Sequence, residues 1–366
     1  MYVSDGELRE ALQRWCSGYQ PEASAARRFF PDILERRLAA IAALHHPRTL
    51  LRFSYSVKTN PSKPVLDAVR RAGLLAEVIS PQEFEHAIAS GFSPSDVIYN
   101  GPYPARHCAA PPGYVFADSI EAYLGASEAF PHATVGVRLR PPGIASHFGI
   151  VQERLSDLAR EVRGSGRREI GVSFHVRPED YGGYVFRTLV QAVVERAQEL
   201  ERYSGAQIIV FDAGGGKRPD EFDRAISSGE LEWLEEHIIR ALPHVRSVLL
   251  EPGQAIVTSS EAVLARVLEV RRREGEVCEV VVNAGFPEMP QIGTFPHRMF
   301  WIGAGAVRSL TRGSGRIIGR TCLEYDVLAK DVDLSGIDEG DLLAVADTGA
   351  YDASMSFDFA GGRRCP

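Results

Sequence analysis

The sequence predicts an α/β protein in which a (β/α)8 TIM barrel is followed by a smaller, β-rich domain. Short apolar runs rich in β-branched and aromatic residues recur between residues 53 and 250, and helical segments alternate with them. After about residue 260 the pattern changes to β-like runs with weak helical periodicity. The chain has 366 residues, of which 45% are hydrophobic, so it is long enough for one large domain and a smaller one.

Eight short runs in the first part of the chain are predicted to be strands. They cover residues 53–57, 75–79, 97–99, 115–117, 135–139, 172–176, 208–212 and 248–250. Helices are predicted between them, for example over residues 64–72, 81–90 and 184–202, and the first two begin with proline and precede a glycine. Because eight strands alternate with helical or turn-rich segments over about 200 residues, a closed barrel is favoured over an open doubly wound sheet.

The last third of the chain is predicted to form the second domain. Its β-like runs cover residues 263–271, 277–283, 316–318 and 342–347. Several strands without intervening helices are typical of a β-barrel or a sandwich-like domain. We therefore expect a β-rich domain from residue 261 to residue 366.

Composition excludes several classes of partner. The formal net charge is −7 and no basic block is present, which argues against nucleic acid and against an anionic membrane surface. The N-terminus lacks the features of a signal peptide and no apolar run approaches membrane-spanning length, so a cytoplasmic protein is expected. Five cysteines without Cys-x-x-Cys spacing support neither a disulfide framework nor a zinc ribbon, and no metal site is expected. A small-molecule ligand is the remaining expectation.

Lys58 is the most informative residue, because it follows the run 53–57 and Asn60-Pro61 stops the strand just after it. Catalytic residues of a TIM barrel gather at the C-terminal ends of its strands. The residues that follow the predicted strands are Lys58, Ser80, Asn100, Asp118, Arg138, His175, the turn Gly214-Gly215-Gly216 and Glu251. Taken alone, a lysine at the end of a strand is usually a solvated charge. A base, a charged pair, an acid and a glycine turn that meet on one rim of the barrel indicate a ligand-binding or catalytic site instead.

Each of these groups has a chemical use beside its structural one. Lys58 can form an imine, and the glycine turn can be a tight turn or can offer backbone N–H groups to a phosphate, although it lacks the P-loop pattern. His175 can be a core histidine or a ring stacked on a flat cofactor. Glu251 ends an apolar strand, where a carboxylate needs a cationic partner such as a protonated ring nitrogen. Together these are the parts needed to hold pyridoxal 5'-phosphate.

Several motifs then resemble one family. The segment Tyr55–Pro61 is similar to Tyr-Ala-Val-Lys-Ala-Asn-Pro, Glu251–Gln254 to Glu-Pro-Gly-Arg, and Asp347–Tyr351 to Asp-x-Gly-Ala-Tyr. Phe174–Val176, the glycine turn, and His147–Gly149 against Lys-Phe-Gly are further matches, in the right order from about residue 50 to residue 358. The chain resembles fold-type III, alanine-racemase-like pyridoxal-phosphate enzymes, and within them the ornithine/diaminopimelate/arginine decarboxylase family.

The resemblance implies a role for each matching residue. Lys58 would be the Schiff-base lysine, His175 would stack on the pyridine ring, and Glu251 would pair with the pyridine nitrogen, which favours decarboxylation over racemisation. Cys322 would reach the active site from the partner subunit of a homodimer and govern reprotonation. The remaining cofactor-binding residues would be Gly214, Gly215, Gly216, Tyr351 and Arg138. In this family the second domain uses both chain ends, which implies a barrel over residues 30–260 and a β-rich domain from residues 1–29 and 261–366.

Departures from the family pattern concern the phosphate and the substrate. Pro178 stands where the family has a serine near the phosphate, and Gln254 stands where it has an arginine. Arg177 would restore the lost positive charge if its loop turns toward the phosphate. Leu323 replaces the acidic residue that receives a distal ammonium group, a role left to Glu324 or Asp326.

These departures widen the range of functions that we consider. A free diamino acid would leave its distal charge unpaired, at a cost of roughly several kcal/mol. A modified, conjugated or carrier-protein-linked amino acid, as in siderophore and natural-product pathways, fits at least as well. A racemase or epimerase on the same cofactor and a catalytically inactive regulator are the alternatives.

Overall fold

The computed structural model describes residues 3–16, 25–46, 48–177, 183–303 and 306–360. The chain divides into two compact units. Residues 37–256 form the first, and residues 2–36 together with 257–366 form the second. The domain boundaries expected after residues 29 and 260 stay a prediction. Among the described residues, no helix is both long and apolar enough to cross a membrane.

The first unit contains a closed barrel of eight strands in sequence order, in which all neighbours are parallel and the last strand pairs with the first. The strands are β2 (Leu51–Ser56), β3 (Leu75–Val78), β4 (Val97–Tyr99), β5 (Tyr114–Ala117), β6 (Thr134–Arg138), β7 (Glu169–Ser173), β8 (Gln207–Gly215) and β9 (Ser247–Glu251). This confirms the predicted (β/α)8 barrel, including the short strands near residues 97 and 115.

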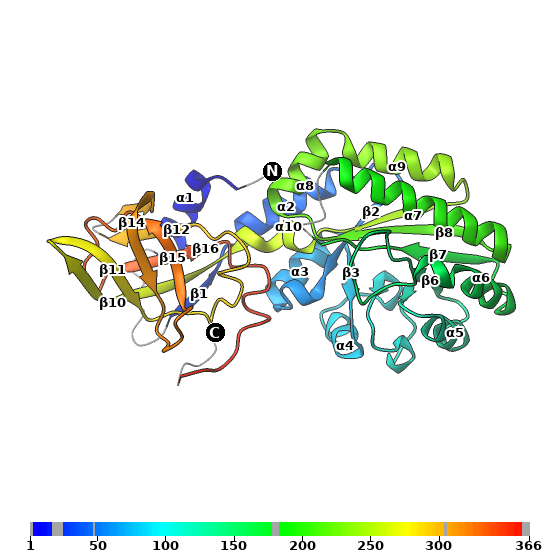
Figure 1. The fold of residues 1–366 in the computed structure, drawn as a ribbon, viewed down its shortest axis with the longest axis horizontal. Coiled ribbons are helices and arrows are strands. Elements are labelled where there is room, and N and C mark those ends of the chain that lie inside the picture. The colour runs from blue at the N-terminus through cyan, green and yellow to red at the C-terminus, as the bar shows by residue number, and fades with distance from the viewer. Residues whose placement is uncertain (1–2, 17–24, 47, 178–182, 304–305, 361–366) are drawn as a thin grey trace. The chain divides into compact units, whose positions relative to one another are not determined.

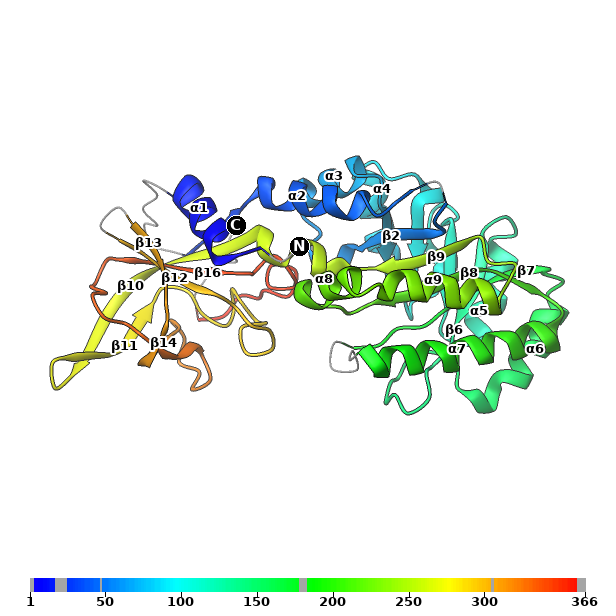
Figure 2. The same cartoon turned by 90° about the horizontal axis from the view of Figure 1, so that it is seen from above.

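Helices lie outside the strands of this barrel (Figures 1 and 2). They are α2 (Pro31–Ala42), α3 (Lys63–Arg71), α4 (Pro81–Ala89), α5 (Ile120–Ala129), α6 (Leu155–Gly164), α7 (Gly183–Ser204), α8 (Pro219–Ser227), α9 (Glu230–Ala241) and the short α10 (Gly253–Val257). Local sequence explains their starts. Ser80 accepts a hydrogen bond from the backbone N–H of Glu83 and Pro81 takes the first turn, so α4 begins where the chain leaves β3.

The interior of the barrel is filled by side chains. Leu75, Ile98, Phe116, Val210 and Leu249, from five different strands, form one buried cluster. Each such side chain contributes roughly 1.5–3 kcal/mol by burial. The barrel is therefore a packed core with two separate ends, and ligands have room only at an end.

The second unit is built around one eight-stranded sheet with the order β13-β12-β16-β10-β11-β14-β15, and β1 pairs with β10. The strands are β1 (Ala26–Phe29), β10 (Glu261–Arg273), β11 (Glu276–Val282), β12 (Met299–Gly303), β13 (Ala306–Ser309), β14 (Arg312–Ile318), β15 (Val327–Val332) and β16 (Leu342–Ala346). All pairs are antiparallel except β11 with β14. The predicted β-rich second domain is confirmed.

Both ends of the chain build this second unit. In α1 (Asp5–Cys16), Leu8 and Leu12 are fully buried, and they pack in one cluster with Phe30, Leu264 and Phe300. Strand β1 runs antiparallel to β10, with Ala26 opposite Leu264 (Figure 1). The N-terminal segment is thus part of the sheet's core.

Candidate active site

Lys58 is paired with a buried carboxyl group. It follows β2 in a single 3₁₀ turn, Val57–Thr59, and its Nζ lies 2.6 Å from Oε2 of Glu77 on the neighbouring strand β3. The Glu77 side chain is 1% exposed, whereas that of Lys58 is 30% exposed. Burial raises the pKa of Glu77 to about 7, although the Lys58 charge opposes this rise. The lysine expected at a strand end therefore has a specific partner.

Two more carboxyl groups are buried at the same end of the barrel. Glu251, the last residue of β9, accepts a hydrogen bond from Asn100 Nδ2 at 3.2 Å, and Asp212 of β8 has no exposed surface. Burial and the neighbouring Glu251 raise the pKa of Asp212 well above its ordinary value. Burial acts in the same direction on Glu251, but neighbouring groups, among them the Lys58 charge and a hydrogen bond from Asp212, outweigh it and hold the pKa of Glu251 below its ordinary value. Asp212 is therefore the more readily protonated of the two.

The glycine turn after β8 is tied to these groups. The Gly214 N–H donates to Asp212 Oδ1 at 2.8 Å, and the Gly215 N–H donates to His175 Nδ1 at 3.2 Å. Gly214 has φ of +69°, and a Cβ there would lie 2.5 Å from the Phe174 carbonyl oxygen, so only glycine fits. Two of the three amides expected to face a phosphate thus bind side chains of the site instead.

The hydrogen bond from Gly215 defines the state of His175. Nδ1 must present a lone pair to that N–H, which places the proton of the neutral ring on Nε2. Burial lowers the pKa of His175, in agreement with a neutral imidazole. Glu251 Oε2 lies 3.8 Å from Nδ1, beyond hydrogen-bonding distance.

Arg138 and Asp118 form the charged pair expected on the rim. Their nearest nitrogen and oxygen atoms are 3.8 Å apart, and the Arg138 guanidinium carbon lies 5.2 Å from the centre of the Phe148 ring. Burial raises the pKa of Asp118, and Arg138 opposes the rise. Ser80, in contrast, belongs to the rim only as the cap of α4.

In the second unit, the loop around Cys322 is organised by Asp326. Cys322 and Glu324 are exposed, while Asp326 is fully buried. Its Oδ1 accepts from the Phe286 N–H at 2.7 Å, and its Oδ2 accepts from the N–H and hydroxyl of Thr321 at 3.0 and 2.6 Å. Both oxygens are thus bonded inside the loop. The expectation that Asp326 or Glu324 receives a substrate ammonium group stays a prediction.

Tyr351 lies in the same unit, in a constrained backbone. Its φ is +68°, and its ring stacks on Phe295 with centroids 6.3 Å apart. The adjacent Asp352 accepts hydrogen bonds from Gln291 N–H and from His297 Nε2 at 3.0 and 2.9 Å. The segment that carries Tyr351 is thereby fixed to the loop before β12. Pro178, one of the departures noted in the sequence, lies outside the described residues.

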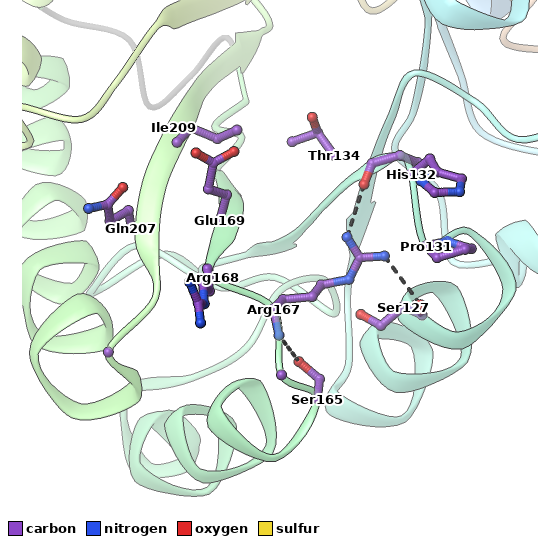
Figure 3. Close-up of a pocket in the computed structure, with 13 residues that line it drawn as sticks. Ser127, Pro131, His132, Thr134, Ser165, Arg167, Arg168, Glu169, Gln207 and Ile209 are labelled. Carbon is purple, nitrogen blue, oxygen red and sulfur yellow. Dashed lines mark hydrogen bonds between the residues drawn. The ribbon is translucent and has the colours of Figure 1, made fainter.

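One hollow of the barrel unit lies away from these residues. It measures about 920 Å³ and opens at the N-terminal ends of β6, β7 and β8, beside Thr134, Glu169 and Gln207 (Figure 3). Arg167 extends across it and donates hydrogen bonds to the carbonyl oxygens of Ser127, in the last turn of α5, and of Phe130 and Ala133, which follow it. Arg167 thus satisfies carbonyl groups at the C-terminal end of α5. The hollow lies at the N-terminal ends of the strands, whereas Lys58 lies at a C-terminal end.

Comparisons with known proteins agree with this architecture. A family model described as "Pyridoxal-dependent decarboxylase, C-terminal sheet domain" matches residues 1–349. The chain is similar to diaminopimelate decarboxylase of Archaeoglobus fulgidus, with 27% identity over 362 residues that cover 91% of this chain and 84% of the relative. It is also similar to diaminopimelate decarboxylase of Methanothermobacter thermautotrophicus, with 25% identity over 335 residues that cover 82% and 76%.

Solved structures share the fold. Lysine decarboxylase from Selenomonas ruminantium superposes with a TM-score of 0.78 at 21% identity, covering 100% of this chain and 96% of that one. Diaminopimelate decarboxylase from Helicobacter pylori, complexed with L-lysine, gives a TM-score of 0.76 at 18% identity and covers 93% and 89%. Since the family model spans nearly the whole chain, the predicted family and its cofactor, pyridoxal phosphate, are confirmed. The chain belongs to the family of pyridoxal-dependent amino-acid decarboxylases.

Proposed function

We propose that Lys58, His175 and Glu251 hold pyridoxal phosphate at the C-terminal end of the barrel. The observation that carries this assignment is that buried carboxyl groups outnumber the amine beside them. One amine, Lys58, is surrounded by three buried carboxyl groups, those of Glu77, Asp212 and Glu251. A cofactor whose ring nitrogen carries a positive charge supplies the cation that Glu251 requires. The residues present therefore fit the group.

The chain's own residues have distinct tasks in this proposal. Lys58 provides the amine that anchors the cofactor, and Glu77 Oε2 stabilises its ammonium form and accepts its proton when the amine must be neutral. His175 places a neutral ring against the cofactor, and Glu251 holds the protonated ring nitrogen. Bound pyridoxal phosphate supplies the electron sink that accepts the electron pair left when a carboxylate leaves as carbon dioxide.

The phosphate site differs from a simple glycine cradle. Because Gly214 and Gly215 donate to side chains, Gly216 is the amide of the turn assigned to the phosphate. We assign Arg138 and Tyr351 to the cofactor as well, and the exposed Arg177 as the charge that replaces the arginine missing at Gln254.

The second unit contributes Cys322. It is exposed on a loop whose shape Asp326 maintains, which supports its use by a second copy of the chain. In a homodimer, the Cys322 thiol of one subunit would donate the proton that replaces the lost carboxylate in the other. A cytoplasmic location belongs to the same proposal.

The substrate in this proposal is an α-amino acid without a free distal ammonium group. Leu323 follows Cys322, both oxygens of Asp326 are bonded within its own loop, and Glu324 is the other acid there. An unpaired ammonium group in a desolvated pocket costs several kcal/mol. Every loss of about 1.4 kcal/mol corresponds to a tenfold loss of affinity. A modified, conjugated or carrier-protein-linked amino acid, as used in siderophore or natural-product synthesis, avoids that cost.

The test begins with the visible absorbance of the purified protein, with and without added pyridoxal phosphate. Carbon dioxide release is then measured with ornithine, lysine and diaminopimelate, and with derivatives whose distal amine is acylated. Lys58→Ala should lose both the absorbance of the bound cofactor and turnover. Lys63→Ala, an exposed lysine five positions later that pairs with Asp67, should keep both.

The outcomes separate the parts of the proposal. Full turnover by Lys58→Ala would refute the assignment of the lysine. Efficient release of carbon dioxide from free diamino acids, with none from the acylated ones, would refute the substrate class but leave the site intact. A protein that stays colourless with added cofactor would favour the inactive regulator.

A further inference from the structure

We infer that Asp212 is a positioning residue of this site, which acts as a neutral carboxylic acid and donates a hydrogen bond to Glu251. This inference rests on the proposed function, since it takes Glu251 as the partner of the cofactor's ring nitrogen. Asp212 does not itself contact the cofactor in this assignment. It keeps Glu251 ionised and aimed at the ring.

The geometry of the Asp212 side chain supports a proton on it. Oδ1 accepts the Gly214 N–H at 2.8 Å, so that oxygen is satisfied as an acceptor. Oδ2 is fully buried, and no donor among the described residues reaches it. An ionised Oδ2 would therefore be a buried acceptor without a partner, which native proteins avoid. The Asp212 and Glu251 carboxyl groups lie close enough for a hydrogen bond between their side chains, so a protonated Asp212 can donate to the Glu251 carboxylate.

The surrounding charges lead to the same assignment. Lys58 is bound to Glu77 at 2.6 Å, and Lys217, which follows the glycine turn, is bound to Glu230 at 2.8 Å, so both of these amines already have a carboxylate partner. His175 is neutral because its Nδ1 accepts from Gly215. Glu251 itself receives one neutral donor, Asn100. Two ionised carboxylates side by side are strongly disfavoured when the nearest amine is already paired with another carboxyl group, so Asp212 and Glu251 share one proton.

This arrangement connects two parts of the site. The Asp212 carboxyl binds the glycine turn through one oxygen and Glu251 through the other, and β8 and β9 also meet there, with Gly215 opposite Glu251. A Cβ at Gly215 would lie 2.1 Å from the Glu251 carbonyl oxygen, so the backbones of the turn and of Glu251 are in close contact. Asp212 therefore transmits the position of the turn to Glu251.

The decisive experiment compares Asp212→Asn, Asp212→Ala and the control Ser173→Ala. Ser173 lies opposite Asp212 on β7, is fully buried, and has a hydroxyl without a hydrogen-bond partner in the described residues. The infrared difference spectrum of wild-type protein minus Asp212→Asn at neutral pH should contain the C=O stretch of a protonated carboxylic acid. Carboxylate bands in its place would overturn the inference.

Cofactor affinity, measured by absorbance titration of the cofactor-free protein, gives the second readout. Asparagine can accept from Gly214 and donate to Glu251, so Asp212→Asn should bind pyridoxal phosphate within about threefold of wild type, as should Ser173→Ala. Asp212→Ala loses a donor to a charged group and should bind roughly 10- to 100-fold more weakly. Binding by Asp212→Asn that is as weak as in Asp212→Ala, or tighter than wild type, would mean that Asp212 is ionised.

Failure of the proposed function has a different signature. If wild-type protein binds no cofactor, or if Glu251→Gln leaves the absorbance of the bound cofactor unchanged, the assigned role of Glu251 fails. The infrared spectrum would still decide the state of Asp212. Thermal unfolding of each cofactor-free variant verifies that the changes in affinity come from folded protein.

Discussion

Glu77 should make the stability of the cofactor-free protein fall as the pH rises through neutrality. Its pKa is about 7 in the folded chain against an ordinary value of 4.5, because burial disfavours the carboxylate. Below pH 4.5 the carboxyl group is protonated whether the chain is folded or not, and its contribution is fully present. As the pH rises through about 7, the unfolded chain has already released the proton that the folded chain retains, and this contribution is lost.

The size of the effect follows from the same values. Each pKa unit corresponds to about 1.4 kcal/mol, so moving the pKa of Glu77 from 4.5 to about 7 corresponds to roughly 3 kcal/mol. The side chain is almost completely buried, so solvent screening does not reduce this value. Glu77→Gln removes the titrating group and retains its shape. Denaturant unfolding of wild type and variant at several pH values from 4.5 to 8 should show that their difference changes by roughly 3 kcal/mol.

Two results would contradict this reasoning. Parallel pH profiles of the two proteins would mean that Glu77 does not change its protonation on unfolding. A wild type that gains stability over the variant as the pH rises would mean that Lys58 lowers the pKa of Glu77 more than burial raises it. Glu85→Gln, which changes an exposed carboxylate on α4, is the matched control.

Three further predictions concern the second unit. Cys322→Ala should keep the bound cofactor but slow or misdirect the proton that replaces the carboxylate, seen as a changed product in mass spectrometry; loss of cofactor would contradict its placement. Asp326→Ala leaves the partly buried amide of Phe286 and the N–H of Thr321 without their acceptor and should lower the free energy of unfolding by roughly 2–4 kcal/mol, whereas a loss within 0.5 kcal/mol would show that other contacts hold the loop in shape. Asp352 outweighs the effect of burial and raises the pKa of His297, so the pair should stabilise the protein at low pH and lose this contribution as the pH rises through that pKa. His297→Gln should flatten that part of the pH profile of stability, and an unchanged profile would assign it to other groups.

The sequence predicted the barrel well because its signals are local. A parallel strand buried on both faces reads as a short apolar run, and a helix start such as Ser80-Pro81 is encoded within a few residues. The strand ends located Lys58, His175 and Glu251, since the C-terminal ends of all barrel strands meet on one rim. The second sheet was predicted less completely. Strands β12, β13 and β15 are short and partly exposed, so their apolar pattern is weak.

Two carboxyl groups of the site were missed for a specific reason. The candidate residues were those that follow each predicted strand, whereas Glu77 and Asp212 lie inside β3 and β8. A single acidic residue within an otherwise apolar buried strand was the available signal, because such a charge requires a partner. The role of Asp326 was not accessible in this way. It depends on Phe286, which lies 40 positions away in the chain, and on the loop conformation that brings them together.

The pairing of β1 with β10 also affects how this protein is made. Arg28 lies opposite Ala262, so a strand that leaves the ribosome early must wait for 234 further residues before its partner exists. At roughly 5–20 residues per second, that interval is on the order of 10–50 s. During this time the apolar side chains of α1 have no sheet to cover. The segment that carries α1 and β1 is therefore the part of the nascent chain most exposed to binding by chaperones.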